Sequence, residues 1–401
     1  MDLFKDLLDE NKWNSFLMSK IESNYLSPKE IKEFKDFITE KKYLDICESI
    51  IKNEYEFSIP KKIVINKIGK NKKRIVYMFN EDEVIILKYI NYLLYDYDYM
   101  FSSNLYSFRK NKSVKDAING IQRIHNLDNM YAYKVDISNY FNSVPIDRLL
   151  VNLKNEIDEN TYNLFNSILS NNKVIYNKKV IEEEKGIMAG VPISSFLANY
   201  YLKDMDRYFE NNNIKYFRYA DDILVLSNNI EELIEYKNDI HKYLIDSGLN
   251  INPDKEYIFN PKESVEFLGF EINGRIVDIS KMQLKKIKGK IKRSARKFRR
   301  WKLEKNVEDI PTLVTMNKKF NNKFYGKEDD ELSWRYYFFP LINTTDSLHE
   351  IDLYMQECQR YVVTGVHNKK NYEKVPYDFL KKCKYKSLVH EYYEFIQKNV
   401  K

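Results

Sequence analysis

Apolar and polar positions recur with different periods along the chain, and each change of period predicts a new element. Residues 1–55 repeat apolar side chains at helical spacing. Within them, Ser27 is followed by Pro and then, three positions after Ser27, by Glu30, which predicts the start of a helix. From residue 60 to 76 the pattern alternates as in strands around a Gly-Lys-Asn segment, which predicts a basic hairpin. Residues 81–99 return to helical spacing.

The middle of the chain predicts one strand and one hairpin that both carry acids. Residues 131–136 form a short run that ends on Asp136. Residues 216–226 contain two apolar runs around an Ala-Asp-Asp segment, which predicts a hairpin with Asp221 and Asp222 at its tip. Acids therefore lie at the ends of two different predicted sheet elements.

The order of elements around these acids predicts a split βαβ sheet. A helical pattern over 230–247 stops before Gly248, which suits the left-handed position that often ends a helix. The order strand, helix, hairpin, helix, strand is typical of the split βαβ arrangement. The other predicted elements are helices near 146–170 and 193–210, strands at 255–259 and 265–272, and helices beyond residue 280 that break near Pro311, Gly326 and Pro340.

Composition and length indicate a globular protein of two or three domains. The chain has 401 residues, of which 43% are hydrophobic and 31% charged. Its net charge of +7 permits an anionic partner without requiring one. Residues 281–302 concentrate that charge, because twelve of the 22 positions are Lys or Arg and the apolar ones form a stripe. This segment predicts an amphipathic helix with a basic face, which either contacts phosphates or is merely solvated.

Cysteine usage and hydropathy predict a cytoplasmic protein without a membrane segment. Cys47, Cys358 and Cys383 lie far apart, with no pair at zinc spacing, which fits reduced thiols. The N-terminus is acidic and amphipathic, unlike a signal peptide. No apolar run approaches the roughly 18 residues that cross a bilayer.

The three acids are candidates for a divalent-metal site. Two Mg²⁺ ions about 3.5–4 Å apart need hard oxygen ligands on rigid elements, and short Asp side chains at strand ends or hairpin tips provide them. If the sheet places the two elements side by side, Asp136 meets Asp221 and Asp222 although 85 positions separate Asp136 from Asp221. An Asp pair in a turn is more often ordinary turn chemistry, and a strand can simply end on Asp. Neither feature alone supports a function.

Further segments accompany the acids in a fixed order. They are Val135–Phe141, Lys185–Ser195, Ala198–Leu202, Phe217–Asp222, Gly248–Lys255 and Phe267–Phe270. In these segments the chain resembles bacterial reverse transcriptases of the group II intron, retron and defence-associated kind, whose motifs A to E come in this order. The resemblance covers about residues 58–275 and is greatest to standalone defence-associated (unknown-group and abortive-infection-like) enzymes. It implies an α+β right-hand polymerase with fingers, a split βαβ palm and a helical thumb.

The resemblance implies a role for each acid. Asp136 and Asp221 correspond to the metal ligands, with help from the main-chain carbonyl of Ile137, and Asp222 to the acid that supports them. The implied cofactor is a pair of Mg²⁺ ions, for which Mn²⁺ can substitute.

The same resemblance implies residues that bind nucleotide and primer. Phe141 corresponds to a steric gate that disfavours a 2′-hydroxyl, although it could also be a core aromatic. Basic residues of the predicted hairpin would hold the triphosphate, although a solvated turn would look the same. The full sets are Lys72, Arg74, Arg109, Phe141, Gly190 and Lys255 for the dNTP, and Phe267, Leu268 and Gly269 for the primer grip. Ala189 stands where many relatives have Gln, which puts nucleotide selection in question.

The C-terminal region resembles the ends of standalone defence-associated enzymes. Its aromatic residues alternate with basic ones over residues 358–393, a composition that suits folded RNA, and Arg360, His367 and Tyr372 are the predicted RNA contacts. An ordinary packed helical cap is the alternative.

These observations predict three regions and one activity. The regions are an N-terminal helical extension (1–57), fingers and palm (58–275), and a thumb with an RNA-binding region (276–401). The expected activity is RNA-directed DNA synthesis from dNTPs, in antiphage defence, with a dedicated non-coding RNA as template and cDNA as product. A retron-type enzyme, an RNA-dependent RNA polymerase and a catalytically silent RNA-binding module are the alternatives. A homo-oligomer or a partner effector protein is left open.

Overall fold

The computed structural model describes residues 3–22, 26–66, 73–326 and 333–399. Its contacts divide the chain into two compact units, which are described separately below. Unit 1 comprises Met1–Ala117 and Met130–Pro261, and unit 2 comprises Ile118–Asn129 and Lys262–Lys401. The α+β class predicted from the sequence is confirmed, because the described residues form both helices and sheets. The predicted boundaries of the three regions stay a prediction.

Unit 1 begins with helices, as the apolar spacing predicts. Ser27 caps the third of them: its side chain accepts from the Glu30 amide, and the Glu30 carboxylate accepts from the Ser27 amide. The helices pack through a cluster of aromatic rings, in which Trp13 lies 3.7 Å from Tyr89, centroid to centroid. The elements are α1 (Leu3–Leu7), α2 (Glu10–Glu22), α3 (Pro28–Thr39), α4 (Tyr43–Ile51), α5 (Glu81–Leu93) and the 3-10 helix η1 (Leu94–Met100).

The first sheet of unit 1 has the strand order β2-β1-β4-β5. Its strands are β1 (Lys61–Asn66), β2 (Lys73–Met78), β4 (Lys173–Tyr176) and β5 (Lys179–Glu182). The β1–β2 hairpin is confirmed. The sequence pattern missed β4 and β5, because β5 is exposed at every position and has no apolar face to reveal it. Their turn, Asn177-Lys178, has positive φ at both residues without the Gly that marks such turns in a sequence.

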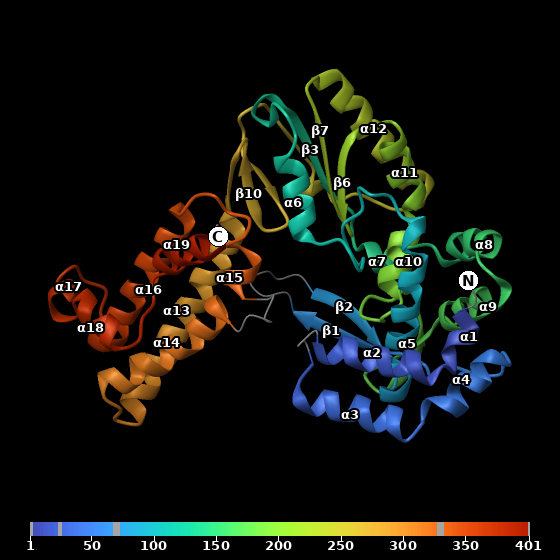
Figure 1. The fold of residues 1–401 in the computed structure, drawn as a ribbon, viewed down its shortest axis with the longest axis horizontal. Helices are drawn as coiled ribbons and strands as arrows, with labels where there is room; N and C mark the ends of the chain where they lie inside the picture. Colours follow the sequence, from blue (N-terminus) through green and yellow to red (C-terminus); the bar gives the residue numbers. More distant parts are fainter. Residues whose placement is uncertain (1–2, 23–25, 67–72, 327–332, 400–401) are drawn as a thin grey trace. The chain divides into compact units, whose positions relative to one another are not determined.

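The second sheet of unit 1 contains the strands that carry the acids. Its order is β6-β7-β3-β8, with every neighbouring pair antiparallel. The strands are β3 (Tyr131–Asp136), β6 (Lys215–Tyr219), β7 (Asp222–Ser227) and β8 (Tyr257–Phe259). Figure 1 shows β3, β6 and β7 side by side, and helix α12 contacts both β3 and β7. The predicted split βαβ order is confirmed.

The remaining helices of unit 1 connect these strands. The helix predicted over 230–247 is confirmed, and Gly248 takes the left-handed φ of +70° after it. The elements are α7 (Tyr140–Ser143), α8 (Ile146–Glu156), α9 (Glu159–Leu169), α10 (Ser194–Tyr201), α11 (Lys203–Asn211), α12 (Ile230–Asp246) and the 3-10 helix η3 (Pro253–Lys255). Lys255 therefore ends a helical turn and does not begin the strand predicted there.

Unit 2 combines a small sheet with long helices. The strand predicted over 265–272 is two strands, because Leu268 and Gly269 both have positive φ and turn the chain. Pro311 lies inside the first turn of its helix, where Pro is tolerated, so the predicted break falls before it. The elements, besides α6 (Val114–Gln122), which unit 1 shares, are η2 (Leu127–Asn129), β9 (Val265–Phe267), β10 (Phe270–Asn273), β11 (Ile276–Ile279), α13 (Lys281–Glu304), α14 (Asp309–Tyr325), α15 (Trp334–Tyr337), α16 (Asp346–Thr364), α17 (Asn371–Lys374), α18 (Tyr377–Lys382) and α19 (Leu388–Asn399).

The amphipathic helix predicted near 281–302 is α13. Leu284, Ile287, Ile291 and Ala295 are buried on one side of it, and α13 contacts α16 and α14. Within the described part of the chain, no helix is long and apolar enough to cross a membrane.

Candidate active site

Asp136 and Asp222 face each other across the central strands of the β6-β7-β3-β8 sheet. They are direct partners in the antiparallel register of β3 and β7, so their side chains leave the same face of the sheet. Lys134, two residues before Asp136, shares that face, and its Nζ lies 3.4 Å from a carboxylate oxygen of Asp222. The two acids that the sequence separates are therefore neighbours.

Asp221 sits in the two-residue turn between β6 and β7. Tyr219 pairs with Asp222, and Ala220 before Asp221 has a φ of +56°, which is unusual for a residue with a Cβ. The main-chain oxygen of Asp221 accepts a 3.0 Å hydrogen bond from the amide of Ile137, the residue after Asp136. This bond joins the hairpin tip to the end of β3, as the two-acid pattern predicts.

The electrostatics of the site favour a cation. Burial, and after it the neighbouring charge of Asp136, raise the pKa of Asp221 to about 6. Burial also raises the pKa of Asp222, although the ammonium of Lys134 opposes this. Three carboxylates in one partly buried place repel one another, and a positive charge among them relieves that repulsion.

Lys255 provides one such charge. Its ammonium forms an ion pair with the carboxylate of Asp136. Burial lowers the pKa of Lys255, but the hydrogen bond to Asp136 and the negative charges of the three acids together raise it above its ordinary value. The main chain brings the two together, because the amide of Asn252 donates to the carbonyl of Asp136 at 2.7 Å, just before the η3 turn.

The donor chemistry fits a divalent cation, although the side chains do not form a closed metal cage. Asp136, Asp221 and Asp222 supply only hard carboxylate oxygens, which Mg²⁺ and Mn²⁺ prefer. Among the described residues there is no cluster of three or more His, Cys, Asp or Glu side chains disposed to enclose an ion. The Lys255 ammonium meanwhile bonds the Asp136 carboxylate that such an ion would need.

The loop that contains Gly190 is hydrogen-bonded to Asn142 on one side and to Tyr77 of strand β2 on the other. The amide of Ala189 donates to Asn142 at 2.9 Å, and its carbonyl accepts from the amide of Tyr77 at 2.8 Å. Gly190 has a φ of +100°, and a Cβ there would lie 3.1 Å from the Tyr77 carbonyl, so the position needs Gly. Ala189 itself is buried, at 6% exposure.

Phe141 lies next to this loop and is partly buried. Its ring meets that of Phe108 edge to face at 5.9 Å, and its carbonyl accepts from the amide of Ile187 at 2.8 Å. The ring packs against the core, so these contacts fit both the gate and the core-aromatic interpretation.

The predicted basic residues of the fingers have different surroundings. Arg74 is exposed on β2, opposite Ile65. Lys72 lies outside the described residues. The guanidinium of Arg109 donates to both carboxylate oxygens of Asp98 at 2.8 Å and to main-chain oxygens, with only 8% of the side chain exposed. These contacts give Arg109 a structural role, and we do not retain it as a phosphate ligand.

The predicted primer grip forms the turn between β9 and β10 of unit 2. The carbonyl of Gly269 accepts from the amide of Ser280 at 2.9 Å, and the carbonyl of Leu268 accepts from the Tyr337 hydroxyl at 3.2 Å. Phe267 is fully buried and anchors the turn in the core. The role of this turn as a primer grip stays a prediction.

The structure changes the predicted RNA contacts at the C-terminus. Arg360 is only 3% exposed; its Nε donates to the Val375 carbonyl at 3.0 Å, and its guanidinium lies 4.0 Å over the Tyr372 ring. Arg360 is therefore a packing residue, contrary to the prediction of a surface contact. His367 stacks on Tyr361 at 4.7 Å and is exposed, as is Tyr372, and both line an open hollow of about 490 Å³.

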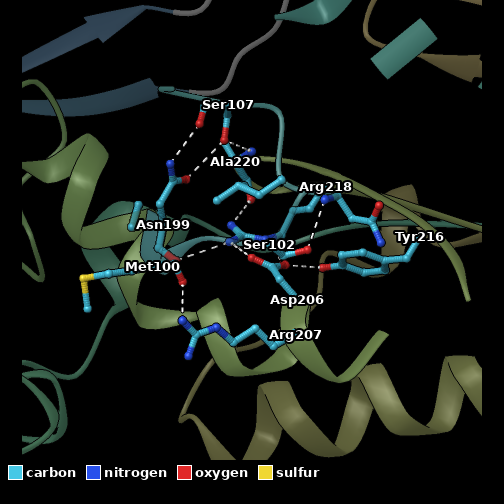
Figure 2. Close-up of polar contacts among 12 residues, drawn as sticks. Met100, Ser102, Ser107, Asn199, Asp206, Arg207, Tyr216, Arg218 and Ala220 are labelled. Carbon is cyan, nitrogen blue, oxygen red and sulfur yellow. Dashed lines mark hydrogen bonds and ion pairs between the residues drawn. The ribbon is translucent and has the colours of Figure 1, made fainter. Parts of the chain in front are cut away.

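Sequence reasoning missed the polar residues that surround the acids. Lys134 could have been noticed, because it lies two residues before Asp136 on the same strand face. Arg218 stands between two aromatic residues of a buried strand, and a charge there signals a buried partner. Figure 2 shows that partner, Asp206, together with Ser107 near the turn.

Comparison with known proteins gives a family match that contains the acids. Residues 59–272 match the family described as reverse transcriptase (RNA-dependent DNA polymerase). The COX1/OXI3 intron 2 protein of Saccharomyces cerevisiae is 25% identical over 296 residues, which cover 57% of this chain and 33% of that protein. The DNA-directed RNA polymerase subunit beta'' of Plasmodium falciparum is 27% identical over 257 residues, which cover 52% of this chain and 25% of that protein.

Among solved structures, an apo telomerase from Candida tropicalis, truncated from its C-terminal domain, is similar with a TM-score of 0.45 and 14% identity. The similarity covers 56% of this chain and 55% of that one. The chain spans a quarter to a third of the length of the curated relatives it matches.

Proposed function

This chain belongs to the reverse transcriptase family, whose α+β right-hand polymerase fold it has, and on that premise we propose that it synthesises DNA on an RNA template. The observation that carries the proposal is the convergence of Asp136, Asp221 and Asp222 inside the matched segment. Carboxylates at strand ends on one sheet face are what template-directed nucleotidyl transfer needs.

We infer that Asp136, Asp221 and the main-chain carbonyl of Ile137 hold two Mg²⁺ ions, with Asp222 supporting them. When bound, such ions activate a 3′-hydroxyl and neutralise the leaving pyrophosphate, and Mn²⁺ can replace them. Asp221 must lose its proton to act as a ligand, so its raised pKa makes cation binding compete with protons. The ion pair with Lys134 orients the carboxylate of Asp222.

Lys255 has a proposed role in the change from the free to the loaded site. In the structure its ammonium neutralises Asp136. The Lys255 side chain is 46% exposed, so if the Asp136 carboxylate were occupied by a cation, the ammonium would be able to turn toward the phosphates of a dNTP. In the free site, Lys255 thus reduces the electrostatic repulsion among the three carboxylates.

Selection of deoxynucleotides is assigned to Phe141 and the loop beside it. The loop around Gly190 supports the base-pairing side, and exposed Arg74 on β2 is the proposed phosphate contact of the fingers. Ala189 is buried, and its methyl group is too short to reach a nucleotide as a Gln side chain would. Phe141 and the other residues near the loop would therefore have to discriminate among nucleotides.

The proposed template is a dedicated non-coding RNA, and the proposed role is antiphage defence. The basic face of α13 and the exposed rings of His367 and Tyr372 support an RNA partner. The defence role rests on the resemblance of the sequence to standalone defence-associated enzymes. A retron-type enzyme, which makes RNA-linked single-stranded DNA, is the second candidate.

Primer extension tests the activity directly. Purified protein is incubated with an RNA template, a DNA primer and either dNTPs or rNTPs, with Mg²⁺, Mn²⁺ or Ca²⁺. DNA products that need Mg²⁺ or Mn²⁺ and disappear in Asp221→Asn support the proposal. Preferential rNTP use would favour an RNA polymerase, and RNA binding without any synthesis would favour a silent module.

The partner is tested from the native locus. RNA and DNA that co-purify with the protein are sequenced, and phage plating is compared between wild type and Asp221→Asn. One enriched RNA with matching cDNA, and protection lost in the variant, are expected. A random sample of transcripts would contradict the dedicated template.

A further inference from the structure

A network of hydrogen bonds among buried polar side chains lies next to the turn that carries Asp221. At its centre, Arg218 of β6 and Asp206 of α11 form an ion pair in which both side chains are 0% exposed. The Arg218 Nε donates to Asp206 Oδ1 at 2.7 Å, its Nη2 donates to Oδ2, and the Tyr216 hydroxyl donates to Oδ1 at 2.8 Å. Figure 2 shows these groups converging from one helix and one strand.

Arg218 connects this ion pair to the turn itself. Its Nη1 donates to the carbonyl of Ala220 at 3.1 Å, and its Nη2 lies 3.4 Å from the carbonyl of Asn199. The main chain of Arg218 is bonded on both sides as well, since its amide donates to Asn104 and its carbonyl accepts from Tyr106. The Arg218 guanidinium thus links the buried Asp206 carboxylate to the main chain of the hairpin turn.

Ser107 bonds the preceding peptide unit, on the other side of the Ala220 Cα. Its Oγ accepts from the amide of Ala220 at 2.8 Å and lies 3.2 Å from Asn199 Oδ1. Asn199 in turn donates from its amide nitrogen to the Ser107 carbonyl at 2.8 Å. Ser107 and Asn199 are 0% exposed, so water does not compete for these bonds.

Both polar main-chain groups of Ala220 are therefore bonded to buried partners, and Ala220 is the residue in the left-handed conformation. A residue with a Cβ holds that conformation only when its surroundings over-determine it. A buried ion pair contributes little net stability compared with apolar packing, which leaves specificity of conformation as a reason for its presence here.

We propose that Ser107 and the Arg218–Asp206 pair are positioning residues that hold the two peptide units flanking Ala220 and thereby preset the carboxylate of Asp221. The proposal rests on the proposed function for its catalytic consequence, but its structural consequence stands independently. A carboxylate that must meet a cation and a reacting phosphate tolerates displacements of only about 0.5 Å, which is why the turn needs this support.

Ser107→Ala is the informative variant, because replacing Arg218 would leave Asp206 buried and unpaired and would destabilise the whole unit. Ser102→Ala is the matched control. Ser102 is also a buried serine, 2% exposed, in the same segment, and its Oγ accepts from the amide of Asn104 rather than from the turn. Ser107→Thr keeps a hydroxyl and tests for rescue.

Three measurements separate positioning from a general loss of stability. For Ser107→Ala, kcat for DNA synthesis should fall about 10–100-fold while KM for dNTP changes less than about twofold, since the displaced group acts in the transition state. Amide hydrogen exchange over residues 219–222 should rise at least about tenfold. In Ser102→Ala both should stay near wild type at a similar loss of stability, and Ser107→Thr should recover most of kcat.

Equal effects of Ser107→Ala and Ser102→Ala on kcat, or unchanged exchange at 219–222, would overturn the proposal. Amide hydrogen exchange is measured without substrate, so it tests the positioning of the turn even if the wild-type protein makes no DNA. In that case the proposed function fails, while faster exchange in Ser107→Ala alone would still establish that Ser107 holds the turn.

Discussion

Replacing Asp221 with Asn should stabilise the metal-free protein at neutral pH while it removes DNA synthesis. The carboxylate is partly buried beside Asp136, and both burial and that neighbour oppose its ionisation. An amide has nearly the same shape and carries no charge, so the variant avoids this cost. It also lacks the anionic oxygen that a hard cation needs.

The size of the effect follows from the pKa. The pKa of Asp221 is raised from an ordinary value of 3.8 to about 6, and each unit corresponds to about 1.36 kcal/mol. Above pH 6 the folded wild type therefore carries a penalty of up to about 3 kcal/mol relative to a neutral side chain. As pH falls through 6 the folded state binds the proton first, the penalty shrinks, and near pH 4 it is gone.

Urea unfolding in EDTA at pH 8, 6 and 4.5 measures this directly, with Asp246→Asn, an exposed carboxylate, as control. The free energy of unfolding of Asp221→Asn should exceed that of wild type by about 2–3 kcal/mol at pH 8, with the difference closing toward pH 4.5. Mg²⁺ at about 100 times its Kd should add about 2.7 kcal/mol to wild type and less to the variant. A difference that does not change with pH, or a destabilised variant, would refute the assignment of a strained carboxylate.

The remaining predictions concern the other acid, the gate and the RNA contacts. Asp136→Asn should lower primer extension at least about 10³-fold with circular dichroism unchanged, and near-normal extension would exclude Asp136 as a ligand. Phe141→Ala should raise rNTP incorporation relative to dNTP about tenfold or more, and an unchanged ratio would make Phe141 a core residue only. His367→Ala with Tyr372→Ala should weaken binding of the co-purifying RNA about 10–100-fold in a filter assay while generic duplex binding stays within twofold. Arg360 is left intact in that test because its burial would confound binding with stability.

Local signals in the sequence were enough to locate most of the secondary structure around the site. The capping box at Ser27, the strand that ends on Asp136 and the hairpin tip at Asp221 are all where the pattern places them. Such signals work because caps, turns and apolar periodicity depend on residues only a few positions apart. The order of elements then restricts the sheet to few topologies, so the meeting of the acids was predictable as well.

Tertiary packing alone decided which polar groups surround those acids. Lys255 pairs with Asp136 across 119 positions, and the Ser107 hydroxyl holds the Ala220 amide across 113. Burial likewise turned Arg109 and Arg360 from apparent surface cations into packing residues. A basic residue looks the same in a sequence whether it binds a phosphate or a buried partner. The difference lies in the free energy of removing its charge from water, and only the folded chain determines whether a partner is present to offset that cost.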